Sequence, residues 1–172
     1  MLTRMRALAL TSLLALAVPG AAQAGFLVEG SLGVGWQLSP DVTRTPVNVM
    51  VAPGWAFVDD IVRLQLGLVG SLGDVQNSKF DLELRPMVTV SPPLFPLYLR
   101  AILAVQNLTE HSGPLTWAYG GALGLRFGVL GAGAFVEAGV LPRNVTVQTA
   151  SGASQDEFRW FGEARAGAYW EF

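Results

Sequence analysis

Apolar and polar residues alternate along the last fifteen residues of the chain. Phe158, Trp160 and every second residue as far as Phe172 are apolar or small, and all charges fall on the positions between them. A period of two predicts a β-strand, because successive side chains of a strand point to opposite faces. The apolar face has aromatic residues at both ends and small residues in the middle. That distribution is typical of a strand that crosses a membrane.

The same alternation recurs along the rest of the chain after residue 24. We therefore expect eight strands, at residues 25–38, 46–58, 61–72, 79–90, 97–106, 115–127, 132–141 and 158–172. Residues 145–149 can extend the seventh strand. Pro53 and Pro86 lie inside expected strands and predict bulges, because proline cannot donate a ladder hydrogen bond. The connections after the second, fourth and sixth strands are short, and the others are mostly longer and polar, as in outer-membrane barrels.

The first 24 residues predict a cleavable signal peptide. Arg4 and Arg6 precede an apolar run at residues 8–18, and the run Ala22-Gln23-Ala24 is a small-x-small cleavage site. Cleavage after residue 24 leaves residues 25–172 as a single barrel domain. The chain has no cysteine, which excludes disulfides and thiolate metal sites.

The composition of the chain favours a membrane barrel over other fold classes. Hydrophobic residues make up 51% of the chain and charged residues 14%, yet after the signal peptide no stretch of 18 residues lacks a charge. A transmembrane helix is therefore not expected, and the other structure that satisfies its backbone in lipid is a closed barrel. Without Arg4 and Arg6, nine basic residues face 13 acidic ones, so nucleic acid is not an expected partner. The predicted fold class is an all-β, eight-stranded antiparallel up-and-down transmembrane β-barrel.

The C-terminal tail resembles the assembly signal of bacterial outer-membrane β-barrels, which ends on phenylalanine after alternating aromatic or apolar residues. Here the residues that carry the resemblance are Tyr169, Trp170 and Phe172. Residues 25–172 are similar in size and plan to small eight-stranded barrels such as outer-membrane protein X and the transmembrane domain of outer-membrane protein A. This resemblance implies the outer membrane of a Gram-negative cell, with both termini periplasmic. It also implies contact with outer-membrane lipid, periplasmic chaperones and the barrel-assembly machinery, and leaves the extracellular partner open.

Ten charged side chains have the strand parity that points into the barrel. They are Glu29, Arg63, Asp81, Glu83, Arg85, Arg100, Arg126, Glu137, Glu163 and Arg165. Because an unpaired buried charge is costly, these five acids and five bases are expected to pair and fill the lumen. Strand adjacency predicts the contacts Arg126 with Glu137, Glu83 and Arg85 with Arg100, and Glu163 and Arg165 with Glu29.

Aromatic residues on the opposite parity predict a girdle at each membrane interface. They are Phe26, Trp36, Trp55, Phe57, Phe80, Trp117, Tyr119, Phe127, Phe158 and Trp160. A soluble, lipocalin-like exported binding protein would instead turn this oily face inward and the other face to water. That other face is rich in glycine, alanine and serine, which suits a narrow lumen better than a solvent coat.

Chemistry-bearing motifs are sparse. His111 is the only histidine and lies next to Ser112 in an expected loop, so neither a metal site nor a lipid-modifying enzyme is predicted, and no cofactor is implied. The sequence favours a structural or interaction barrel that presents its loops. A narrow gated pore, or a barrel that handles small molecules or lipids, is the alternative.

Overall fold

The computed structural model describes residues 25–38, 47–58, 60–72, 80–93, 95–106, 108–109, 115–148 and 154–172. Within residues 144–148 and 154–157 the description is of the backbone alone. The predicted signal peptide at residues 1–24 and the neighbours His111 and Ser112 lie outside these ranges. No helix within them is long and apolar enough to cross a membrane.

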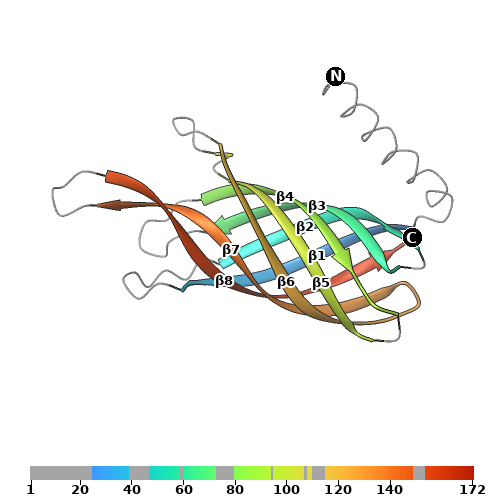
Figure 1. Cartoon of the computed structure of the whole chain (residues 1–172). Coiled ribbons are helices and arrows are strands. Elements are labelled where there is room, and N and C mark those ends of the chain that lie inside the picture. Colours follow the sequence, from blue (N-terminus) through green and yellow to red (C-terminus); the bar gives the residue numbers. More distant parts are fainter. Residues whose placement is uncertain are drawn as a thin grey trace, which may run out of the picture.

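Eight strands form one closed antiparallel barrel, in which each strand pairs with the next and β8 pairs with β1 (Figure 1). The strands are β1 (Gly25–Gln37), β2 (Val47–Phe57), β3 (Val62–Leu72), β4 (Phe80–Val90), β5 (Leu97–Gln106), β6 (Thr116–Val129), β7 (Ala132–Gln148) and β8 (Ser154–Glu171). The predicted fold class, an all-β, eight-stranded antiparallel up-and-down barrel, is confirmed. The bounds differ most at β7, which ends at Gln148 rather than at residue 141, and β8 begins at Ser154 rather than at residue 158.

The barrel has a large stagger between strands. Pairing can be followed through Phe26, Trp55, Leu64, Val88, Ala101, Gly121, Val140 and Gly162 to Trp36. One circuit therefore returns to β1 ten residues beyond its start. With ~3.3 Å per residue and ~4.8 Å between strands, this stagger tilts the strands by about 40° from the barrel axis.

The two strand prolines do not create bulges, so that prediction is wrong. The register of β2 with β3 is the same on both sides of Pro53, with Val51 opposite Leu68 and Gly54 opposite Gln65. The register of β4 with β5 is likewise unchanged across Pro86. Each proline remains paired on its other side, Pro53 with β1 and Pro86 with β3. The missing N–H therefore interrupts one ladder locally and inserts no extra residue.

The exterior of the barrel is apolar over the length of the strands. Leu66 on β3 is 46% exposed, and Leu32, Leu99 and Leu123 are exposed in the same way. Large exposed aromatic residues occur at both ends of the strands, with Phe26, Trp55, Phe127 and Trp170 at one end and Trp36, Phe80, Trp117, Tyr119, Phe158 and Trp160 at the other. Phe57, in the first of these groups, is half-buried. A soluble barrel has the opposite arrangement, with its apolar side chains inside and its polar side chains facing water.

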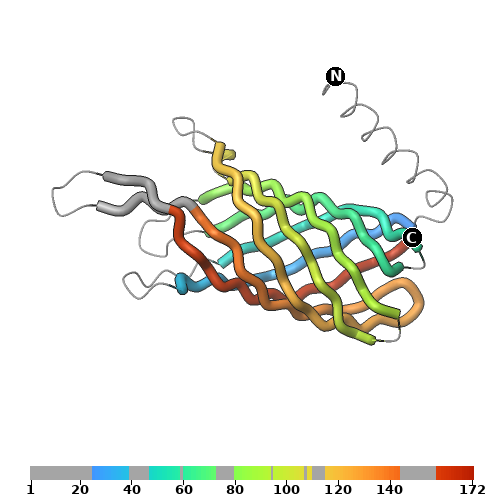
Figure 2. Tube along the Cα trace, in the orientation of Figure 1, coloured from blue at the N-terminus to red at the C-terminus, as the bar shows by residue number. Residues whose placement is uncertain are grey.

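The two ends of the barrel differ. The C-terminus lies beside the start of β1 (Figure 2), where the Phe172 amide donates to the Phe26 carbonyl at 2.8 Å. We call this the terminal end. At the opposite end, β7 and β8 pair with each other as far as Gln148 and Ser154. The ladder of β7 with β6 stops at Val140, and that of β8 with β1 stops at Phe161. The β7–β8 hairpin therefore projects beyond the barrel (Figure 1), and we call this the hairpin end.

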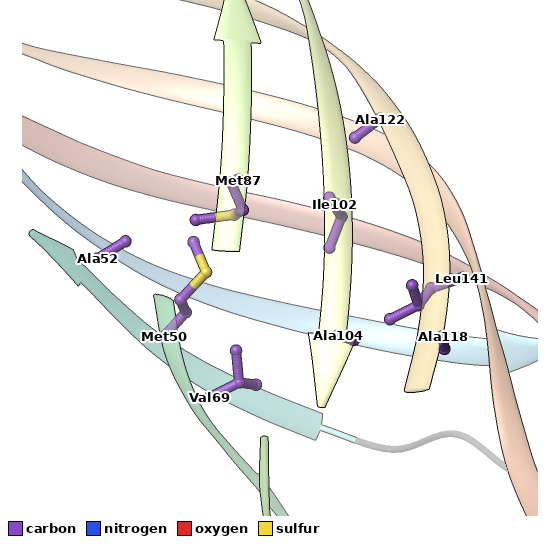
Figure 3. Packing of buried hydrophobic residues seen from close by; sticks show 9 residues of the cluster. All are labelled: Met50, Ala52, Val69, Met87, Ile102, Ala104, Ala118, Ala122 and Leu141. Carbon is purple, nitrogen blue, oxygen red and sulfur yellow. The ribbon is translucent and has the colours of Figure 1, made fainter. Parts of the chain in front are cut away.

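Apolar side chains fill part of the lumen. Their cluster comprises Met50, Ala52, Val69, Met87, Ile102, Ala104, Ala118, Ala122 and Leu141, which come from six strands (Figure 3). Elsewhere in the lumen, aromatic rings lie against glycines. A Cβ added to Gly124 would come within 2.3 Å of the Tyr98 ring, so glycine is needed there for the ring to fit. The lumen is thus packed by side chains, as a barrel of eight strands requires.

Candidate functional site

Charged side chains occupy the lumen at three levels, and the first lies at the terminal end. Arg63 donates from Nε and Nη2 to the Asp60 carboxylate, and Arg126 donates from Nη2 to Glu171. The Arg126 Nη1 atom lies 3.4 Å from Asp60 Oδ2, and its guanidinium lies 3.5 Å from the centroid of the Tyr169 ring. Burial raises the pKa of the Asp60 carboxyl, and the neighbouring Arg126 guanidinium partly offsets that rise.

The second level is centred on Arg100, which is buried. Its Nη2 donates to Glu29 at 2.8 Å and its Nη1 lies 2.9 Å from Glu137. The Tyr98 hydroxyl donates to Glu137 at 2.8 Å, and Arg100 Nε donates to Thr89 at 2.9 Å. Glu29 belongs to β1 and Arg100 to β5, so this ion pair spans the lumen between opposite walls. Charged hydrogen bonds of this length are among the stronger polar contacts in proteins.

The third level lies toward the hairpin end. Arg85 is 0% exposed and donates to both Glu83, at 2.7 Å, and Glu163, at 2.8 Å. Arg143 lies 2.5 Å from Glu83 and donates to Glu163 at 2.8 Å. Arg165 donates to Glu163 at 3.0 Å and lies 3.9 Å from Glu137. Arg165 therefore connects the third level to the second.

Acids and bases balance over the described lumen. The carboxylates of Asp60, Glu29, Glu83, Glu137, Glu163 and Glu171 contact the guanidinium groups of Arg63, Arg85, Arg100, Arg126, Arg143 and Arg165. The third level has one more base than acids, and the second has one more acid than bases. Their excess charges have opposite sign and meet at Arg165 and Glu137, which keeps the buried network neutral.

The structure places nine of the ten charged residues singled out from the sequence in these levels. The tenth, Asp81, is half-buried on β4, with its Oδ1 3.5 Å from Thr109 Oγ1. Three members were missed, namely Asp60, Arg143 and Glu171. Asp60 lies in a turn, and Arg143 fell in the expected loop after the seventh strand. Glu171 lies in the expected strand at residues 158–172 with the inward parity of Glu163, so parity alone would have found it. Arg143 has the parity of Glu137 and would have been found by continuing the seventh strand.

The predicted partners of these charges are wrong. Arg126 contacts Asp60 and Glu171 rather than Glu137, because β6 and β7 place Arg126 opposite Phe135 and Glu137 opposite Gly124. Arg100 lies opposite Thr89 and contacts neither Glu83 nor Arg85 through a described ion pair. Glu29 pairs with Arg100 instead of meeting Glu163 and Arg165. Long side chains meet across a narrow lumen, so adjacency along the wall does not determine the partner.

The residues of the predicted assembly signal point in different directions. Tyr169 is buried in the lumen beneath Arg126, whereas Trp170 and Phe172 are exposed on the outer surface. The Phe172 ring lies 6.1 Å from that of Phe26, which is itself 5.8 Å from Trp55. The two exposed residues thus belong to the aromatic group at the terminal end.

Among the residues that the structure describes, no cluster of histidine, cysteine or carboxylate side chains is arranged to hold a metal ion. The acids of the lumen contact arginines instead. Each of these contacts is an ion pair between a carboxylate and a guanidinium.

Fold and lumen together define a small, closed, eight-stranded up-and-down barrel with an apolar exterior. No protein-family model matches the chain, and no curated protein sequence matches it. Among solved structures it is similar to Neisserial surface protein A (NspA), with a TM-score of 0.57 at 10% identity, covering 87% of this chain and 97% of that one. A structure from the de novo design of transmembrane β-barrels matches at 15% identity with a TM-score of 0.45, covering 85% and 95%. The likeness to NspA shows a shared fold.

Proposed function

We propose that the protein is an integral barrel of the bacterial outer membrane whose lumen is closed by side chains and whose β7–β8 hairpin binds a partner outside the cell. The apolar exterior supports membrane insertion, because Leu66 and its neighbours have no other apolar surface to cover them in the described structure. The exposed aromatic residues at both strand ends match the girdles that such barrels place at the two interfaces.

In the proposed orientation the terminal end faces the periplasm. Two of the three connections at that end are short in the structure, at residues 58–61 and 130–131, and short turns are typical of the periplasmic side. The hairpin end then faces outward. A strand count of eight supports this orientation, because an even number of strands returns the chain to the side from which it entered, and the predicted signal peptide delivers the chain to the periplasm.

The closed lumen is supported above all by two ion pairs, which we call bridges, that connect opposite walls of the barrel. Arg100 on β5 pairs with Glu29 on β1, and Arg85 on β4 pairs with Glu163 on β8. Both arginines are buried, and a cluster of buried apolar side chains fills another part of the lumen. A lumen filled in this way supports a structural or interaction role rather than conduction or catalysis.

The hairpin supports an interaction role through its backbone. Beyond Val140 on β7 and Trp160 on β8, the described ladders pair these two strands with each other alone. Each strand therefore leaves an outer edge that no described ladder pairs, although the Pro142 carbonyl accepts from Gln106 Nε2. An extended segment of another protein can pair with such an edge by strand addition. We propose such a segment of an external protein as the partner.

Three measurements test this proposal. Folded protein in detergent should migrate differently on a gel before and after heating, and the same preparation should give no steady conductance in planar bilayers. Replacing residues 144–157 with a two-residue turn should leave the gel shift intact and abolish strand-addition partners captured by crosslinking at the hairpin. Steady channels in the unmodified protein would favour the narrow pore, and a barrel that stays soluble without detergent would favour the lipocalin-like alternative.

A further inference from the structure

A cavity of about 250 Å³ lies at the terminal end, between the turn that joins β2 to β3 and the segment that joins β4 to β5. Its charged side is formed by Asp60, Arg63 and Arg126 around the Tyr169 ring. Its apolar side is formed by Pro92, Pro93 and Phe95, which are exposed. A site with two sides of this kind suits a ligand that has a polar end and an apolar body.

Two buried donors on this cavity lack acceptors among the described residues. The Ser91 Oγ and the Arg126 Nη1 atoms are both buried without a hydrogen-bond partner. The Arg126 side chain is 10% exposed, and although Nη1 lies 3.4 Å from Asp60 Oδ2 it makes no hydrogen bond there. A buried donor without an acceptor is costly, and such groups usually have a partner in the complete assembly. Both donors therefore indicate a ligand that brings acceptor oxygens.

The charges around the cavity are balanced, so an anionic end on that ligand requires one of the carboxylates to give up its place. Arg63 and Arg126 share the carboxylates of Asp60 and Glu171. The Asp60 side chain is 40% exposed, so it can turn toward water and leave its place beside Arg126 to another carboxylate. A carboxylate accepts from a guanidinium and a hydroxyl together, in shorter and stronger hydrogen bonds than a neutral acceptor makes.

We propose that this cavity binds the free C-terminal carboxylate of a short peptide, with its oxygens accepting from Ser91 Oγ and Arg126 Nη1. The last side chain of the peptide, apolar or aromatic, lies against Pro92, Pro93 and Phe95. The volume supports an occupant of this size, because 250 Å³ corresponds to roughly eight water molecules at ~30 Å³ each, close to one amino-acid residue. Capture of a terminal carboxylate is a recurring mode of peptide recognition.

The test uses the full chain folded in detergent micelles and two probes that differ only in their terminal group, acetyl-alanyl-phenylalanine and its amide. Calorimetric titration should show binding of the acid and binding at least roughly tenfold weaker for the amide, because the amide cannot form the charge-assisted hydrogen bonds. The Ser91→Ala variant should weaken binding of the acid by roughly tenfold for the same reason. Phe95→Ala should weaken both probes.

Ser71→Ala is the matched control, because the Ser71 Oγ is also buried without a partner but lies at the hairpin end of β3, away from the cavity. It should leave the affinity unchanged. Equal binding of acid and amide, no heat with either probe, or equal effects of the two serine changes would each overturn the proposal. Displacement of the acid by equimolar inorganic phosphate would also overturn it, since the site would then take any anion. Heat-shifted gel migration of every variant separates these outcomes from loss of the barrel, so failure here is independent of the proposed function.

Discussion

Leu130 occupies the left-handed backbone region in the two-residue turn between β6 and β7. Its φ is 55°, that of Gly131 is 80°, and the flanking Val129 and Ala132 pair with each other. A turn with positive φ at both central residues favours asparagine followed by glycine, whereas a leucine in this region is strained. The Leu130 side chain is 99% exposed, so packing in the barrel does not compensate.

We therefore expect Leu130→Asn to raise the free energy of unfolding by about 1 kcal/mol. Equilibrium unfolding in urea, monitored by tryptophan fluorescence in micelles, measures the change. Leu97→Asn is a useful comparison, because Leu97 is an exposed leucine in a strand and should not be stabilised by the same substitution. A loss of stability in Leu130→Asn would show that the leucine contributes more through the membrane interface than its backbone costs.

The buried charges make a second prediction at this scale. Glu29 and Arg100 are 2.8 Å apart, whereas Glu137 and Arg126 form no described contact. A double-mutant cycle to alanine should give a coupling free energy above about 1 kcal/mol for the first pair and below about 0.5 kcal/mol for the second. The second pair also serves as the control, since it removes the same two residue types from the same lumen. Equal coupling in the two cycles would contradict the register described here.

These pairs show what a sequence can predict about a lumen. Period two determined which charges point inward, because side-chain direction is a local property of a strand. The partners of Glu29 and Arg126 depend on the stagger of the whole barrel and on the reach of arginine across it. Both are global properties, so adjacent strands suggested contacts that the structure does not contain. Asp60 was missed because a turn has no parity to follow.

At the scale of the element, the end of β8 combines a buried and an exposed aromatic contact. Tyr169 lies beneath Arg126, and Phe172 lies beside Phe26 on the outer surface. Changing Phe172 to Asp should reduce insertion into the outer membrane and leave periplasmic aggregate, since a charge replaces the exposed terminal ring. Fractionation of cells followed by immunoblotting measures the distribution. Normal insertion of Phe172→Asp would remove the assembly role of this residue, and Phe95→Asp, another exposed phenylalanine at that end, is the control.

The outer face of β3 allows a prediction about how deep its residues lie in the bilayer. Leu66 lies near the middle of β3 and is 46% exposed. In the proposed orientation Leu66→Arg should lower the free energy of unfolding by roughly 2–4 kcal/mol, the cost of arginine near the centre of a bilayer. Unfolding from lipid vesicles in guanidinium measures it. The same substitution at Leu72, at the hairpin end of the strand, should cost much less, and equal costs would argue against a bilayer around β3.

Element bounds were predictable where the alternation is strong. The local structure at the two strand prolines was not predictable. A proline without its N–H can lie either in a bulge or beside a gap in one hydrogen-bond ladder. At Pro53 and Pro86 the register stays constant on both sides, so the gap is what occurs. The length of β7 and β8 was underestimated, since residues 142–157 lie beyond the apolar belt that defines the pattern.

At the scale of the whole molecule, strand count, order and sidedness of the faces follow from the sequence, because a closed meander has few alternatives once eight strands are placed. The stagger of ten residues does not follow from it. It is determined only when β8 meets β1, where Leu27 to Gln37 pair with Glu171 to Phe161. The outer edges of the β7–β8 hairpin are likewise visible only after the other ladders have ended.

The bridges between opposite walls also constrain the order of assembly. Arg85 and Arg100 each take one acidic partner from β8 or β1, the two strands whose pairing closes the barrel, and another from β4 or β7. In an open sheet these arginines would lose Glu163 and Glu29, so that more of each buried charge would be left uncompensated. Insertion should therefore be coupled to closure, with no long-lived open sheet in the bilayer. Removing both charges of a bridge should uncouple the two steps and make a partly inserted species visible in stopped-flow fluorescence.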